Sequence, residues 1–206
     1  MTETHEATDS GQGAYRVPFV RLSRLAASPA GLVVLGVWGF AEAIVFFIIP
    51  DVGLSILALV APRRAVPLFV AAVVGALAGT AVLYAWAMAS PAVVESVLLA
   101  IPGIGPPMIA AAHEQVSDGS PLSIMQFGAG TPLKVYTYAW ATGPQTAPTM
   151  LVAALVNRLT RIGPGVAVAA AVGHLAPGLL RRHDRLVLLL YAIGYIVGYV
   201  LYFRSL

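Results

Sequence analysis

Cysteine is absent from this 206-residue chain, and only 10% of its residues carry a charge. The lack of cysteine excludes disulfide bonds, thiolate catalysis and cysteine-ligated metals. Soluble domains contain about 25% charged residues, so the scarcity of charge, together with 59% hydrophobic residues, indicates an integral membrane protein.

The few basic residues are also dispersed. The formal net charge is +3, but the arginines stand at the ends of apolar segments and form no single stripe, so no nucleic-acid partner is expected. The four histidines are scattered along the chain, which predicts no metal site. No cofactor is expected either.

The chain contains four long runs without charged residues. They cover residues 65–94, 135–157, 162–180 and 186–203, each near or above the roughly 18 to 20 residues of a spanning helix. The predicted fold class is therefore an all-α polytopic membrane protein with about three spanning helices, short interfacial helices and two re-entrant helical hairpins.

Three regions follow from the distribution of polar residues. Residues 1–14 are polar and predict a disordered tail. Residues 15–30 alternate arginines with apolar side chains, which indicates a basic segment at an anionic membrane surface, or else an ordinary basic flank. Residues 31–206 are expected to form one membrane domain.

The first hairpin is predicted at about residues 31–61. Within "AEAIVFFIIPDVGLSILALVAP", two acids, Glu42 and Asp51, stand in apolar sequence that is interrupted at Pro50 and Gly53. A proline removes a hydrogen bond of the helix, so the backbone there must be covered by protein or line a wet cavity. A re-entrant hairpin accommodates such a break.

Basic residues precede and follow this hairpin, with Arg24 before it and Arg63 after it. A hairpin returns both to one side of the membrane, whereas a full crossing would separate them. Because basic flanks favour the cytoplasm, the N-terminus is expected to be cytoplasmic.

The second hairpin is predicted at about residues 121–143, with breaks at Gly130 and Pro132. Lys134, the only lysine in the chain, follows directly. A hairpin entering from the opposite face would make the chain an inverted repeat whose broken helices meet near the middle of the membrane, as in many transporters.

The remaining segments are predicted from hydropathy and small residues. The clearest spanning helix covers residues 66–89, with Gly75 and Gly79 as a close-packing face. Residues 90–120 are expected on the outer side. Residues 146–180 cross either once or twice, and one kinked crossing agrees better with the charge bias.

The last predicted helix, residues 186–203, carries a stripe of tyrosines and two glycines four residues apart. We expect both features to serve helix packing. They are Tyr191, Tyr195, Tyr199 and Tyr202, and Gly194 and Gly198.

Five charges within apolar sequence are the candidate site: Glu42, Asp51, Lys134, Arg158 and Arg161. Each costs about 2.5 to 3.5 kcal/mol at the centre of a bilayer, so they should face protein or water, where acids and bases can pair and exchange protons. On one continuous helix the two acids would point in opposite directions, and the break lets them converge. Static salt bridges, or positions near the headgroups, are the alternative.

Three stretches resemble the DedA family, the bacterial branch of the VTT-domain proteins, also called SNARE-associated Golgi proteins. They are "AEAIVFFIIPDVGLSILALVAP", "GTPLKVYTYAWATG", which is similar to a Pro-x-Lys segment, and "LVNRLTRIG", which is similar to an Arg-x-x-Arg segment. Ala129 and Leu133 stand where the common pattern has arginine and glycine, so the similarity is to a divergent branch.

The resemblance implies two opposed re-entrant hairpins in a bacterial inner-membrane protein that moves lipids between leaflets. It implies undecaprenyl phosphate or phospholipids as cargo, with proton or sodium coupling. It also implies that Glu42 and Asp51 match the family's embedded acids and Arg158 and Arg161 its basic pair, with Lys134 matching less closely.

The expected function is thus a transporter or flippase for anionic membrane lipids. An ion-coupled transporter of small solutes uses the same charges, and a structural or assembly factor is a third alternative. No enzyme is expected, because the sequence has no Gly-x-Ser-x-Gly or His-Glu-x-x-His motif.

Overall fold

The computed structural model describes residues 17–48, 50–117, 120 and 130–204, and within these ranges the chain is helical with no strand. Three of the described helical segments are long and apolar enough to span a membrane, namely Pro62–Ala89, Ala147–Leu175 and Asp184–Leu201. This confirms the all-α fold class and agrees with about three spanning helices. The predicted tail, and most of the first arm of the predicted second hairpin, lie outside the described residues.

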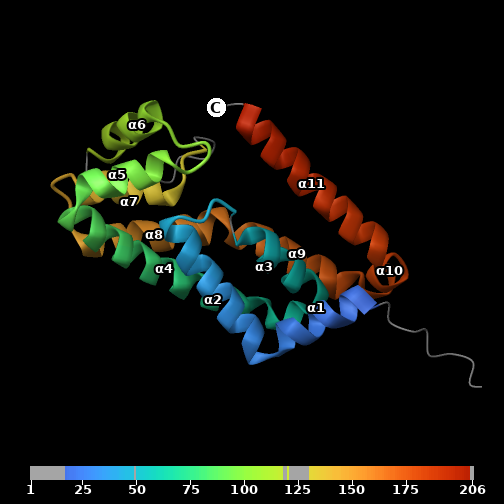
Figure 1. Ribbon diagram of the computed structural model, residues 1–206. Helices are drawn as coiled ribbons and strands as arrows, with labels where there is room; N and C mark the ends of the chain where they lie inside the picture. Colours follow the sequence, from blue (N-terminus) through green and yellow to red (C-terminus); the bar gives the residue numbers. More distant parts are fainter. Residues whose placement is uncertain (1–16, 49, 118–119, 121–129, 205–206) are drawn as a thin grey trace, which may run out of the picture.

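The helices follow one another in the order that Figure 1 labels. They are α1 (Val17–Ala27), α2 (Pro29–Ile44), α3 (Asp51–Val60), the short 3-10 helix η1 (Pro62–Arg64), α4 (Ala65–Ala89), α5 (Pro91–Leu99), α6 (Pro106–Val116), α7 (Leu133–Ala141), α8 (Ala147–Arg161), α9 (Gly163–Leu175), α10 (Pro177–Arg182) and α11 (Asp184–Arg204). Helices α1 and α2 meet at Ser28 with a bend of 85°.

The distribution of side chains is inverted relative to a soluble protein. Large apolar side chains are exposed on the outside, including Val66 at 72% and Leu175 at 85%, whereas Glu42, Lys134 and Arg158 are each less than 5% exposed. An apolar exterior of this extent is unfavourable in water and favourable in lipid. The structure therefore agrees with the membrane class predicted from composition.

Helices α2 and α4 lie side by side and run in the same direction. A side chain on Gly75 would overlap the backbone of Gly36, and one on Gly79 would overlap that of Phe40. Residue numbers therefore increase in the same direction along both helices. Glycines let two helix backbones approach closely. The close-packing face predicted at Gly75 and Gly79 is confirmed.

Because α2 and α4 are parallel, the chain between them has to return to its starting end, and α3 makes this return. At that end the Arg64 guanidinium donates a hydrogen bond of 3.3 Å to the Ala26 carbonyl oxygen, which ties the start of α4 to the end of α1. Residues 29–64 thus leave from and return to one end of the molecule.

The break between α2 and α3 is longer than the sequence predicted. Helix α2 ends at Ile44, six residues before Pro50, which directly precedes the first residue of α3. The intervening β-branched and aromatic residues are weak helix formers, and the residue before a proline is biased away from the helical region.

The predicted break at Gly53 is wrong, because Gly53 lies inside α3. Its missing side chain makes room for the ring of Trp38, which would come within 2.8 Å of a Cβ atom there. The Trp38 indole in turn donates a hydrogen bond of 2.9 Å to the Ile48 carbonyl oxygen. Gly53 therefore supports the break from within the neighbouring helix.

Helices α8 and α9 form one long segment that runs antiparallel to α4 (Figure 1). Tyr84 near the end of α4 donates to the Gln145 carbonyl oxygen just before α8, and Phe69 near the start of α4 lies beside Gly163 of α9. Pro164 lacks an N–H group, which accounts for the interruption between the two helices. A single candidate span, Ala147–Leu175, favours the one-crossing alternative.

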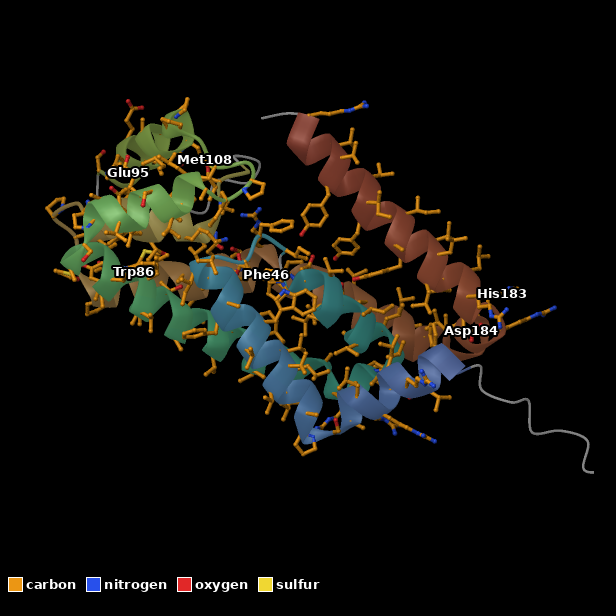
Figure 2. All side chains as sticks on the ribbon, viewed as in Figure 1. Phe46, Trp86, Glu95, Met108, His183 and Asp184 are labelled. Carbon is orange, nitrogen blue, oxygen red and sulfur yellow. The ribbon has the colours of Figure 1, made fainter. Side chains whose placement is uncertain are left out.

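Helices α5, α6 and α7 form a layered group at the end of α4. The Tyr138 hydroxyl donates to Glu95 at 2.9 Å, and the Gln145 amide donates to the Val116 carbonyl oxygen at 2.8 Å. Figure 2 shows Glu95 at this end of the molecule and His183 and Asp184 at the other. The described part of residues 90–120 is divided into two short helices, α5 and α6.

Exchanging Gly75 for alanine should push α2 away from α4, because the added methyl group would overlap the Gly36 carbonyl. We expect the free energy of unfolding to fall by about 1 to 3 kcal/mol, the usual range for an overpacked contact. Thermal unfolding in detergent measures it. Gly178→Ala is the matched control, since no atom lies within 4 Å of its added methyl group. Equal stability of the two variants would contradict the close α2–α4 contact.

Candidate functional site

A cavity of about 610 Å³ lies between α11 and the rest of the molecule, and all five sequence-predicted charges line it. Glu42 comes from α2, Asp51 from α3, Lys134 from α7, and Arg158 and Arg161 from the end of α8. The cavity thus gathers charges that are up to 119 residues apart in the chain (161 − 42 = 119).

Three of these charges form a buried cluster. The Arg158 guanidinium donates to a carboxylate oxygen of Glu42, and the Lys134 ammonium lies 3.7 Å from the other oxygen. Glu42 is 3% exposed, Lys134 2% and Arg158 4%. One carboxylate is therefore held between two cations with little contact to the outside.

The cluster lies near the middle of two candidate spans, α4 and Ala147–Leu175. Ala43, next to Glu42, packs against Gly79, which is residue 15 of the 25 in α4. At 1.5 Å per residue, Gly79 is about 21 Å from the first residue of α4 and about 15 Å from the last. Arg158 is likewise about 17 Å from the start and about 26 Å from the end of the span Ala147–Leu175.

Interrupted helices bring their N-terminal ends to the cavity. Asp51 is the first residue of α3, Lys134 the second of α7, and Ile162, which directly precedes α9, also lines the wall. The unpaired N–H groups at a helix start give that end a partial positive charge. The start of α3 therefore favours the Asp51 carboxylate, and the start of α7 adds to the positive potential of Lys134.

The start of α7 depends on the backbone of Gly130. Its φ angle is 65°, a left-handed conformation that residues with a side chain adopt only with strain. Pro132 follows and directly precedes α7, so Lys134 falls in the first turn. Gly130 and Pro132 lie outside any helix, at the predicted break.

Asp51 is bound to α11. The Tyr195 hydroxyl donates to its carboxylate at 2.9 Å, and the Ser55 hydroxyl lies 3.2 Å from the Tyr195 oxygen. Tyr191, one turn earlier on α11, donates to the Val52 carbonyl oxygen at 2.5 Å. These contacts join an otherwise exposed helix to α3, and only 6% of the span Asp184–Leu201 is buried.

The glycines of the α11 stripe do not pack as predicted, whereas Tyr191 and Tyr195 pack against α3 and also line the cavity. Tyr191, Tyr195 and Tyr199 line the cavity with Gly194 and Gly198, and neither glycine has an atom of another described element within 4 Å of an added Cβ. Tyr202 lies at a position whose side chain the structure does not describe. The stripe is therefore part of the site that the sequence prediction missed, and its period of four was the available signal.

Some polar atoms of the site have no hydrogen-bond partner among the described residues. They are one carboxylate oxygen of Asp51 and the Nε atom of Arg158. Arg161 is exposed at the cavity wall. The site thus holds donor capacity that the described protein groups leave unused.

Metal ligation has no support in the described part of the chain, where no three histidines, cysteines or acids come together. Comparisons with protein-family models, curated proteins and solved structures give no match to this chain.

Removing the Glu42 carboxylate should strongly destabilise the protein. Glu42→Ala leaves Lys134 and Arg158 buried without their counter-charge, and breaking a buried ion pair costs about 3 to 5 kcal/mol. Unfolding of the purified protein in detergent measures the loss. Glu114→Ala is the matched control, because Glu114 is exposed on α6 and should change stability by less than about 0.5 kcal/mol. A Glu42→Ala protein as stable as the control would contradict the buried cluster.

Proposed function

We propose that this protein is a DedA-like transporter that moves an anionic lipid, a phospholipid or a polyprenyl phosphate, between the two leaflets of a membrane. The observation that carries the proposal is the excess of positive charge in the cavity, three of whose charged side chains are buried. Three bases and two acids line it, a balance of +1 when all are ionised (3 − 2 = +1). A phosphate group complements this balance.

The proposal includes two opposed re-entrant hairpins. The first is α2 and α3, and its support is the return of residues 29–64 to one end of the molecule. The second includes α7, and its support is the helix start that Gly130 and Pro132 create at the cavity. Broken helices that aim their N-termini at a central anion are a recurrent device of transporters.

In this proposal the Glu42 carboxylate and the anionic group of the cargo compete for the same cations. The Glu42 carboxylate pairs with Arg158 and lies beside Lys134. When a phosphate enters, it competes for the same donors and for the spare Nε of Arg158. Protonation lowers the cost of displacing Glu42, because a neutral carboxyl group attracts the two cations less.

The proposed orientation places the N-terminus in the cytoplasm of a bacterial cell, with a multi-pass chain in the inner membrane. The support is a set of exposed arginines near the end where residues 29–64 begin and return: Arg21, Arg24, Arg63, Arg182 and Arg185. Helix α9 joins this end through the contact of Gly173 with Leu59. Basic flanks favour the cytoplasmic side.

The transport test uses protein reconstituted into vesicles and a fluorescent phosphatidate or polyprenyl phosphate followed from one leaflet to the other. Arg158→Ala should slow the movement at least tenfold, since losing one member of a buried charge pair costs roughly 2 to 5 kcal/mol. Arg182→Ala removes an exposed arginine outside the cavity and should retain the wild-type rate.

Three results would overturn the proposal. Wild-type rates in Arg158→Ala would refute the mechanism. Uptake of a small anion with no lipid movement would favour a solute transporter. Normal growth of cells after neutralisation of all five cavity charges would favour a structural or assembly factor.

Replacing Glu42 by glutamine should change anion binding and transport in opposite directions. Without the carboxylate, Arg158 and Lys134 lack their competitor, so binding of inorganic phosphate should tighten roughly tenfold, equivalent to about 1.4 kcal/mol. The transport rate should fall, because no carboxylate is left to take the place of the bound cargo on Arg158 and Lys134 and so release it. Calorimetric titration with phosphate measures the first effect, with Glu114→Gln as the control. Weaker phosphate binding in Glu42→Gln would contradict the competition.

A further inference from the structure

A second hollow of about 490 Å³ adjoins the charged cavity. Ile48 and Val52 line it on the side of α3, and Ile196 and Val200 on the side of α11. Tyr195 and Tyr199 line both hollows. We call this hollow the α11 groove, and the shared tyrosines place it directly beside the charged cavity.

The two hollows differ in chemistry at this boundary. Five charged side chains line the cavity, where the Tyr195 hydroxyl donates to the Asp51 carboxylate, whereas Arg204 is the one charged residue among the described residues that line the groove. The groove adds aliphatic side chains, of which Ile196 is 61% exposed and Val200 46%. Tyrosine has a polar tip on an apolar ring and suits the boundary between a wet and an oily region. Together the hollows match a ligand with an anionic head and a hydrocarbon chain.

We propose that the α11 groove binds the hydrocarbon chain of the lipid whose anionic group lies at Arg158 and Lys134. The inference rests on the proposed function, and it specifies the path by which the chain stays in contact with the bilayer. Helix α11 is held to the molecule by α10 at one end (Figure 1) and by the tyrosine contacts to α3, and most of its other apolar side chains are exposed.

The free energy of moving a hydrocarbon chain from the bilayer into the groove is small. A hydrocarbon chain gains little free energy on leaving lipid for an equally apolar groove, since the hydrophobic effect does not act between two oily environments. Affinity must therefore come from the anionic head, and the chain is placed by its attachment to that head. A chain in the groove should depend on Arg158, whereas bulk lipid around α11 should not.

The experiment compares two lipids that carry the same photoreactive diazirine in one acyl chain. One is a phosphatidate and the other a neutral phosphatidylcholine, each present at low concentration in phosphatidylcholine vesicles that contain the full-length protein. After illumination, mass spectrometry maps the labelled residues. We expect the phosphatidate to label the groove residues in excess over the neutral lipid, and the excess to be lost in Arg158→Ala.

A pair of valine variants makes the test independent of Arg158. Val200→Trp fills the groove and should abolish the excess labelling and slow lipid movement. Val197→Trp adds the same bulk three residues away, at a side chain that is 49% exposed and lines neither hollow, and should leave both unchanged. Both variants must retain the wild-type unfolding temperature to be compared.

Each other outcome overturns the inference. Equal labelling by both lipids would show that the groove residues contact only bulk lipid of the surrounding bilayer. Absence of excess labelling, together with lipid movement that still requires Arg158, would place the chain elsewhere and leave the proposed function intact. A change in oligomeric mass in Val200→Trp would assign the groove to a second copy of the chain. Movement independent of Arg158 would instead refute the proposed function.

Discussion

The ion pair between Glu42 and Arg158, with Lys134 beside it, is the interaction on which the rest of the structure depends. Charges at this depth are costly in lipid, and the cost falls only when they are enclosed by protein and paired. No single straight helix encloses such a cluster. The chain meets the requirement by interrupting its helices near the cluster and by bringing charges together from α2, α7 and α8.

The glycine contact between α2 and α4 also helps to enclose the charges in protein. It brings the backbone of α2 close to α4, so that Glu42 faces inward while neighbouring side chains such as Val37 are 63% exposed on the outside. The return of α3 then brings Asp51 to the cavity wall, where Tyr195 binds it. Packing of small residues outside the site therefore determines where the acids lie.

Much of this arrangement could be predicted from the sequence because it follows from two strong constraints. Charge-free runs of sufficient length predicted the spans, and the cost of burying charge predicted that Glu42, Asp51, Lys134, Arg158 and Arg161 would meet. The ends of helices were harder to predict. Helix α2 stops at Ile44, well before Pro50, and Gly53 is helical, because local contacts with Trp38 outweigh glycine's tendency to interrupt helices.

The role of α11 could not be predicted, since a tyrosine every four residues is equally consistent with a packed helix and with a cavity wall. Only the position of α11 relative to α3 distinguishes the two, and that position depends on contacts between residues more than 130 apart, such as Tyr191 and Ser55. The first arm of the second hairpin stays a prediction, because residues 121–129 lie outside the described ranges.

The most direct measurement is the coupling free energy between Glu42 and Arg158 from a double-mutant cycle of unfolding in detergent. The wild-type protein, the two single alanine variants and the double variant form the cycle. Partners in one buried network couple by about 0.5 to 3 kcal/mol, and we expect a value in the upper half of that range. A coupling near zero, with strictly additive losses, would show that the two groups do not meet and would contradict the account.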